Sequence, residues 1–345
     1  MPNSSNRFEN NFDALRILAA LAVIFSHSYA LLGVKSEPVN IVTGSLTAGT
    51  FAVGVFFAIS GYLITLSWER KPQAFIFLKK RVLRIFPALI IVVFFSVFFL
   101  GPVVTTLSLN NYFSNPQTWR YLLTISLYYL ISGGASVWTL PGVFTNNPFP
   151  NAVNGSLWMM PYLFSMYLII PVLGKAALIK KGRSIILLYL LAILLLPINA
   201  IHPLPFLGVI SAYLIICFSE GAILYLYRDK IRLDWKIVLL SLFIWALSFA
   251  FSHNEAYLLF VSSLVLPYLV VYFAFIPTPH VHKLTKYGDF SYGLFIYSFP
   301  IQQLFVFFFV TFLTPAILFG LSVIVTLPTA ILSWVLIESR ALKFK

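Results

Sequence analysis

Long hydrophobic runs alternate with short polar segments along the 345 residues of this chain. Each of ten runs is long and apolar enough to cross a bilayer as a helix. The runs span residues 12–33, 47–68, 83–106, 157–174, 184–199, 206–227, 236–252, 256–276, 289–312 and 316–337. Only 10% of the residues are charged, whereas about a quarter of a soluble domain is charged. The pattern therefore predicts an all-α, polytopic membrane protein. We expect one membrane domain over residues 1–345, with no appended soluble domain.

The positive residues predict how the chain is threaded, because loops on the cytoplasmic side are enriched in Lys and Arg. If ten helices cross and both termini are cytoplasmic, 21 of the 23 Lys and Arg lie on the cytoplasmic side. An eleventh apolar stretch, 118–131, is short, and a crossing there would move the cations from Lys175 to Arg183 outside. We therefore expect a re-entrant or lateral segment near 118–131 on the outer side. An irregular outer loop, rich in Gly, Pro and Asn, is expected at 132–156.

Composition limits the partners and cofactors. The net charge is +13, but the positive residues form short clusters between apolar runs, so we expect no nucleic-acid partner. Cys217 is the only cysteine, which excludes an internal disulfide and a cysteine metal site. Because the sequence holds no cluster of metal-ligand residues, no metal is predicted.

Two ionisable residues, Arg16 and His27, lie inside the first apolar run. Eleven positions at about 100° each bring them to within about 20° of the same helix face, about 16 Å apart along the axis. Ionisable groups inside a membrane helix are costly and are therefore functional candidates. Arg16 is either a snorkelling residue at the inner interface or part of an anion site. His27 is either bonded to a neighbouring helix or a general base near the outer surface.

Four local patterns recur in one known family. They are FDALRILAALAVIFSH in the first run, VGVFFAISGYLIT in the second, KKRVLRIFPAL at the start of the third, and KYGDFSYGLFIYSFPIQQ with SWVLIESRAL near the end. Together, from about residue 8 to residue 343, they resemble the acyltransferase-3 family of integral membrane acyltransferases. The resemblance implies an O-acyltransferase of the cell inner (plasma) membrane. Such an enzyme moves an acyl group, most often acetyl, from cytoplasmic acyl-CoA to a sugar hydroxyl of a surface polysaccharide or lipid-linked glycan at the outer face.

The resemblance also implies roles for individual residues, with His27 as the catalytic base. Arg16, Arg81 and Arg84 are expected to hold the phosphates of acetyl-CoA, because guanidinium groups bind phosphate through paired hydrogen bonds. Ser60 and Tyr62 either line the acyl tunnel or flank a close contact between helices at Gly61. The acceptor is expected to meet the outer loop. The residues predicted to bind the acceptor are Asn154, Trp158 and one of the adjacent Gln302 and Gln303. Trp158 alternatively anchors the membrane interface.

Two positions depart from the family's pattern. The family usually has a Glu five residues after the Trp of Asn-Gly-Ser-Leu-Trp, where this chain has Leu163. Ser298 stands where many members have His. A carboxylate at position 163 would lie about as deep as His27, so a weakened or non-catalytic relative is an alternative to the enzyme. A transporter or flippase for a lipid-linked sugar is another, although the chain shows no repeated halves. Of the other acids, Asp13 is expected to pair with Arg16, and Asp289 to cap a helix.

Overall fold

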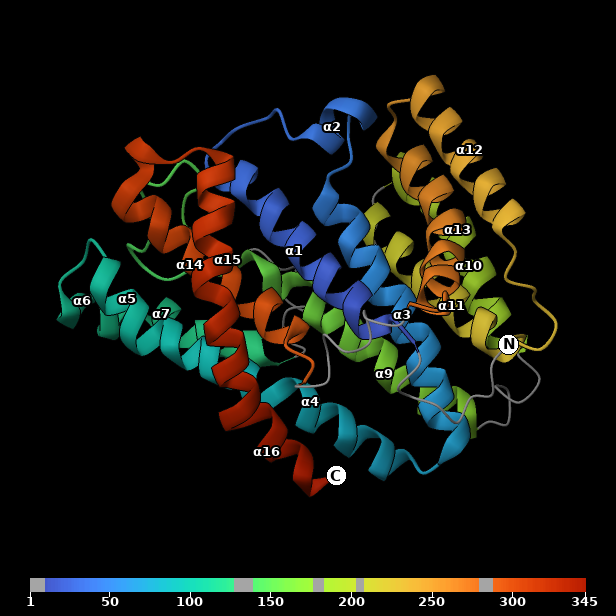
Figure 1. Cartoon of the computed structure of the whole chain (residues 1–345). Helices are drawn as coiled ribbons and strands as arrows, with labels where there is room; N and C mark the ends of the chain where they lie inside the picture. The colour runs from blue at the N-terminus through green and yellow to red at the C-terminus, as the bar shows by residue number, and fades with distance from the viewer. Residues whose placement is uncertain (1–9, 127–138, 176–182, 203–207, 279–287) are drawn as a thin grey trace. The chain divides into compact units, whose positions relative to one another are not determined.

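The protein is a bundle of helices over the residues that the computed structural model describes, which are 10–126, 139–175, 183–202, 208–278 and 288–345 (Figure 1). Its ten long apolar helical stretches begin with α1 (Phe12–Leu31), α3 (Ala48–Arg70), α4 (Ala74–Phe95), α9 (Met160–Lys175) and α10 (Arg183–Ile201). They continue with α11 (Val209–Leu226), α12 (Trp235–Phe251), α13 (Glu255–Ala274), α14 (Ser291–Phe309) and α15 (Pro315–Ser333). Each matches one predicted run, and the described ranges contain no strand, so the all-α prediction is confirmed.

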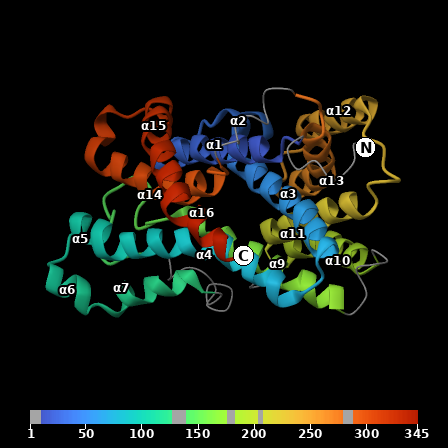
Figure 2. The ribbon, with the colours of Figure 1, turned by 60° about the horizontal axis from the view of Figure 1, so that its bottom comes forward.

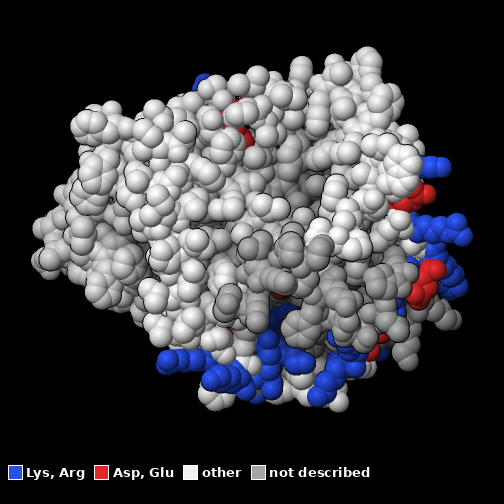
Figure 3. Space-filling view, viewed as in Figure 1, with Lys and Arg blue, Asp and Glu red and all other residues white. Residues whose placement is uncertain are grey.

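Eight of these stretches in the described part of the chain are long and apolar enough to cross a membrane, and α10 and α12 are shorter apolar helices. Most of the surface seen in Figure 3 carries no charged side chain, as expected where lipid surrounds a protein. α4 begins nine residues before the predicted run, so the predicted donor ligands Arg81 and Arg84 lie within a helix. Lys and Arg are good helix formers, which explains why the helix extends beyond the apolar run.

The helical stretch that begins with α4 continues past Phe95, and Ala74–Val104 together form one candidate membrane span. A π-helical turn (Ser96–Leu100) and α5 (Gly101–Val104) end the rod, and the chain then doubles back. α6 (Leu109–Ser114), α7 (Pro116–Arg120) and a 3-10 turn (Tyr121–Ile125) return below α4 (Figure 2). The Tyr112 hydroxyl holds the hairpin together by donating to the Val97 carbonyl at 3.0 Å, and burial raises the pKa of this phenol. The described part of 118–131 consists of short helical turns and forms no candidate membrane span. Its re-entrant or lateral course relative to the membrane stays a prediction, and residues 127–131 lie outside the described residues.

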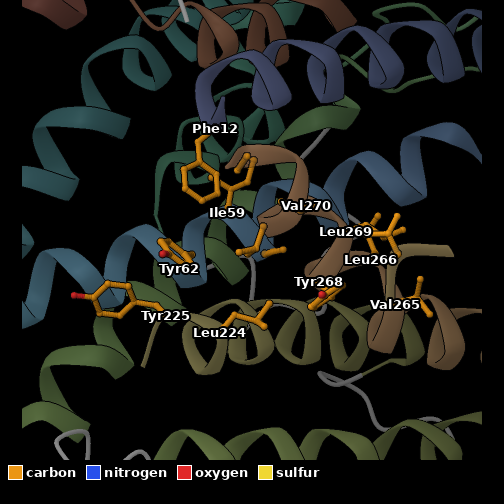
Figure 4. Packing of buried hydrophobic residues seen from close by; sticks show 14 residues of the cluster. Phe12, Ile59, Tyr62, Leu224, Tyr225, Val265, Leu266, Tyr268, Leu269 and Val270 are labelled. Atoms are coloured by element: carbon orange, nitrogen blue, oxygen red, sulfur yellow. The ribbon is translucent and has the colours of Figure 1, made fainter. Parts of the chain in front are cut away.

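The chain divides into two compact units. The first contains α1 up to Ala19, residues Pro38–Leu78 and residues Leu163–Asp289; the second contains the remainder. In the first unit α3 packs on α11 and α13 around an apolar core that includes Phe12, Tyr62 and Tyr225 (Figure 4). The Tyr62 ring lies 5.2 Å from each of the other two rings. In the second unit α14 packs against α15. The prediction of one domain over residues 1–345 stays a prediction.

Candidate active site

His27 lies in the outer half of α1 by the predicted topology and is half-buried. Its ring meets the Phe299 ring of α14 edge to face, with 5.0 Å between the centroids and 82° between the planes. The His27 Nδ1 atom is buried and has no hydrogen-bond partner in the described part of the chain. A buried polar atom without a partner is costly, so such an atom in a native structure is a candidate for contact with a ligand.

The outer loop is docked on α14 above this pair of rings. Asn147 Nδ2 donates to Gln303 Oε1 at 2.6 Å, and Gln303 Nε2 donates to the carbonyls of Phe149 and Ala152 at 3.0 and 2.9 Å. The Phe149 ring lies 6.3 Å from the Phe299 ring. Phe299 therefore contacts both His27 on α1 and Phe149 in the loop. The described part of the loop packs on α14, the same helix that contacts the histidine.

The two adjacent glutamines of α14 have different partners, as expected for neighbours on a helix. Gln302 Nε2 donates to the Ile24 carbonyl and to Ser28 Oγ, each at 2.9 Å, so it binds α1 rather than the loop. Its Oε1 atom is buried without a partner among the described residues. Because Gln303 uses both ends of its amide on the loop, Gln302 is the one that retains an unused acceptor.

Asn154 caps the short 3-10 helix Gly155–Met159, and Trp158 lies within it. Asn154 is buried: its Nδ2 donates to the Ile296 carbonyl at 2.8 Å, and its Oδ1 accepts from the Ser156 amide at 3.2 Å. The Trp158 ring is half-buried and lies 6.0 Å from the Tyr162 ring. Asn154 thus fixes the end of the loop on α14, while Trp158 keeps an accessible edge.

A cavity of about 380 Å³ opens beside this loop. It is lined by Asn115, Gln117, Thr139, Leu140, Pro141, Gly142 and Asn151. Gly142 and Asn151 have φ angles of 70° and 65°, a conformation that favours Gly and Asn. None of these described lining residues carries a charge, so amides and hydroxyls supply the polarity. The outer-loop residues 132–138 lie outside the described residues.

Arg16 is paired with two carboxylates in the first unit. Its Nη1 atom lies 3.5 Å from Asp13, as predicted, and 3.3 Å from Asp289. The prediction that Asp289 caps a helix is wrong, because α14 begins at Ser291 and no side chain caps it. Asp289 was missed as an Arg16 partner because the two residues are 273 positions apart.

Arg84 is also paired, in the second unit. Its Nη1 atom lies 3.2 Å from Glu338, which is fully buried, and its guanidinium lies 5.0 Å from the Trp334 ring. Glu338 also accepts a hydrogen bond from the Ser333 hydroxyl. Glu338 and Trp334 both belong to a π-helical turn (Trp334–Glu338) that follows α15. Such turns are frequent at functional sites. Arg81 lies one turn before Arg84 on α4.

Ser60 and Tyr62 lie buried in α3 on either side of Gly61. A Cβ at Gly61 would lie 1.9 Å from the Phe218 carbonyl oxygen of α11. Reciprocally, a Cβ at Gly221 of α11 would lie 2.1 Å from the Ala58 carbonyl oxygen of α3. The close-contact interpretation therefore describes Gly61, since only glycine allows the two backbones to approach this closely.

The two positions that depart from the family pattern and two glutamates complete the description of the candidate site. Leu163 is buried, and the Ser298 hydroxyl donates to the Phe295 carbonyl of its own helix. Glu37, which sequence reasoning missed because it lies in a short polar segment, is buried as well. Glu220 in α11, also missed, has a buried Oε2 atom without a partner in the described ranges. Within those ranges no three His, Cys, Asp or Glu side chains group to hold a metal.

The fold and these residues define a multi-pass membrane protein in which a histidine of α1 contacts Phe299 of α14, the helix that also binds the described part of the loop. The chain belongs to the acyltransferase-3 family, whose profile, described as an acyltransferase domain, matches residues 9–337. It is 31% identical over 342 residues to a protein of Shigella phage Sf6 named O-acetyl transferase, with 96% of each chain covered. It is 29% identical over 366 residues to nodulation protein 10 of Rhizobium leguminosarum bv. viciae, covering 99% of this chain and 95% of the relative. No solved structure matches the chain. The protein is therefore a membrane acyltransferase.

Proposed function

We propose that this enzyme transfers an acetyl group from cytoplasmic acetyl-CoA to a sugar hydroxyl of a surface polysaccharide or lipid-linked glycan. The observation that carries the proposal is the His27 Nδ1 atom, which is buried without a hydrogen-bond partner among the described residues. His27 lies inside an apolar helix, and its ring contacts Phe299 of α14, the helix that binds the loop. The name of the phage relative, O-acetyl transferase, supports both the acetyl group and an oxygen acceptor. We place the enzyme in the cell inner membrane with both termini cytoplasmic, which the distribution of Lys and Arg supports.

In the proposed reaction His27 acts as general base. It takes the proton from the acceptor hydroxyl as the oxygen forms a bond to the thioester carbonyl carbon. The carbon–sulfur bond then breaks, and the protonated His27 returns the proton to the leaving thiolate. The products are the acetylated sugar and CoA, and neither a metal nor a redox step is needed.

The donor's phosphates are proposed to bind Arg16, Arg81 and Arg84. Arg16 and Arg84 each have a carboxylate partner, so phosphate binding is an exchange of one anion for another. Ser60 and Tyr62 are proposed to line the path of the acyl chain.

The acceptor is proposed to be an uncharged sugar in the outer cavity. Its volume of about 380 Å³ is in the range of small-ligand sites, and its amide and hydroxyl lining suits sugar hydroxyls rather than carboxylates or phosphates. Trp158 and the unused Gln302 Oε1 are proposed further contacts of the acceptor. Asn154 and Gln303 are proposed to act by holding the loop on α14.

Mass spectrometry of surface glycans tests the proposal. Cells that express the wild-type chain are expected to gain one acetyl group per modified sugar, and cells with His27→Ala none. His202→Ala is the matched control, because His202 is exposed. Membrane expression is measured by immunoblot for all three. Full acetylation by the His27→Ala protein contradicts the mechanism.

Leu163 favours the second candidate, a weakened or non-catalytic relative that binds acyl-CoA or glycan. The side chain is buried and apolar where the family usually has Glu. On this candidate the wild-type chain leaves glycans unmodified while Leu163→Glu gains acetylation. Family membership favours acyl transfer over transport as the basic activity.

A further inference from the structure

A buried glutamate, Glu37, is hydrogen-bonded to Ser26, the residue that precedes His27 in α1. Only 3% of Glu37 is exposed, and 6% of Ser26, the residue before His27. Ser26 Oγ donates a hydrogen bond to Glu37 Oε2 at 3.3 Å. All three residues belong to the second unit. An acid enclosed at the end of a membrane helix is costly and is a functional candidate by default.

The turn after α1 brings Glu37 to this position. Val34 N–H donates to the Tyr29 carbonyl at 3.0 Å, and Gly33 N–H donates to the Ala30 carbonyl at 3.1 Å. This is the Schellman pattern, with Gly33 at a φ of 69° in the left-handed region. The chain therefore reverses after Leu31. Glu37 lies six positions beyond the end of the helix, yet its carboxyl meets a residue five positions before that end.

The hydrogen bond limits how far Glu37 is from the histidine. Consecutive Cα atoms are about 3.8 Å apart, so the bonded carboxyl oxygen lies within about 10 Å of the His27 Cα. This limit is to the Cα and not to the ring. For a charge separation of about 10 Å, at the intermediate dielectric of a protein near its surface, the interaction changes a rate by about tenfold.

We propose that Glu37 is a positioning and charge-stabilising residue for His27 that supplies the carboxylate which Leu163 does not. Ser26 holds the carboxylate along α1, and its negative charge favours the imidazolium formed when His27 takes the acceptor's proton. The proposal rests on the proposed role of His27 as base. A purely structural role, in which Glu37 only fixes the turn after α1, requires a hydrogen-bond acceptor for Ser26 but no charge. Glutamine provides that acceptor without the charge, so Glu37→Gln separates the two roles.

The test uses inverted membrane vesicles from the expressing cells, with radiolabelled acetyl-CoA on the cytoplasmic face and the cells' own glycan as acceptor. Acetyl incorporation against acetyl-CoA concentration gives a maximal rate per folded protein and a KM. For Glu37→Gln we expect a maximal rate about tenfold lower with an unchanged KM and Tm. Glu37→Asp should restore most of the rate, and Ser26→Ala should give an intermediate loss. Glu255→Gln is the matched control, since Glu255 is exposed, and should stay within about twofold of wild type.

The outcomes separate this inference from the proposed function. If wild-type vesicles incorporate no acetyl group, the proposed function fails. If wild type is active and Glu37→Gln matches it per folded protein, the inference is overturned and the proposed function stands. A lower Tm for Glu37→Gln with an unchanged maximal rate also overturns the inference, because it shows that Glu37 only fixes the turn.

Discussion

Gly61→Ala should destabilise this protein, although alanine is the better helix former. The added Cβ would lie 1.9 Å from the Phe218 carbonyl oxygen, and ordinary contact begins at 3.4 Å. α3 and α11 must therefore separate locally by about 1.5 Å. Overpacking costs about 1–3 kcal/mol, and the upper end applies because the obstacle is main chain. Helix propensity offsets about 1 kcal/mol, which leaves a net loss of about 2 kcal/mol.

Thermal unfolding in detergent, followed by tryptophan fluorescence, measures the effect. For 345 residues a loss of about 2 kcal/mol corresponds to a fall in Tm of about 3 °C. Gly320→Ala is the matched control: it also lies in a helix, and nothing described lies within 4 Å of its added Cβ. Its Tm should be unchanged or higher. If Gly61→Ala unfolds at or above the temperature of Gly320→Ala, the close approach of the two backbones is refuted.

Three further predictions concern the second unit. Gln303→Ala removes the bonds that dock the loop, at about 1–3 kcal/mol, and limited proteolysis should cut the loop faster; an unchanged cleavage rate contradicts this. Glu338→Gln leaves the partly buried Arg84 without its charged partner and should lower Tm by several degrees, whereas an unshifted Tm shows that the pair contributes nothing. Asn151→Gly keeps the positive φ but removes the amide, so reduced glycan acetylation by mass spectrometry supports sugar contact, and wild-type acetylation argues against it.

The helices could be predicted from the sequence because an apolar run of spanning length has few alternatives to a helix in lipid. The start of α4 could not be predicted from the apolar pattern, because its first turns contain Lys and Arg, which favour a helix without being apolar. The re-entrant or lateral course predicted near 118–131 rests on charge alone, since a crossing would have placed a cluster of cations outside.

The partners of the predicted site residues could not be found in the same way. Asp289 and Glu338 are 273 and 254 positions from Arg16 and Arg84, and one sequence carries no information on pairs so far apart. One of Gln302 and Gln303 was expected to meet the acceptor. The Gln303 amide binds the loop, a role that depends on the loop's folded path. Glu37 lies closer in sequence, but only the reversal at Gly33 brings it back to α1.

The burial of the two arginine pairs bears on the proposed binding of the donor. Side-chain exposure is 44% for Asp13 and 14% for Asp289, the two partners of Arg16, whereas Glu338 beside Arg84 is fully buried. A half-exposed carboxylate is easily replaced by a phosphate, because water solvates it when it leaves. A fully buried carboxylate is not easily replaced by a phosphate, because the helix end around it must open before the carboxylate can leave. Arg16 is therefore the better candidate for direct exchange with phosphate. Arg84, held by Glu338 and Trp334, is better suited to contribute its positive charge from a fixed position.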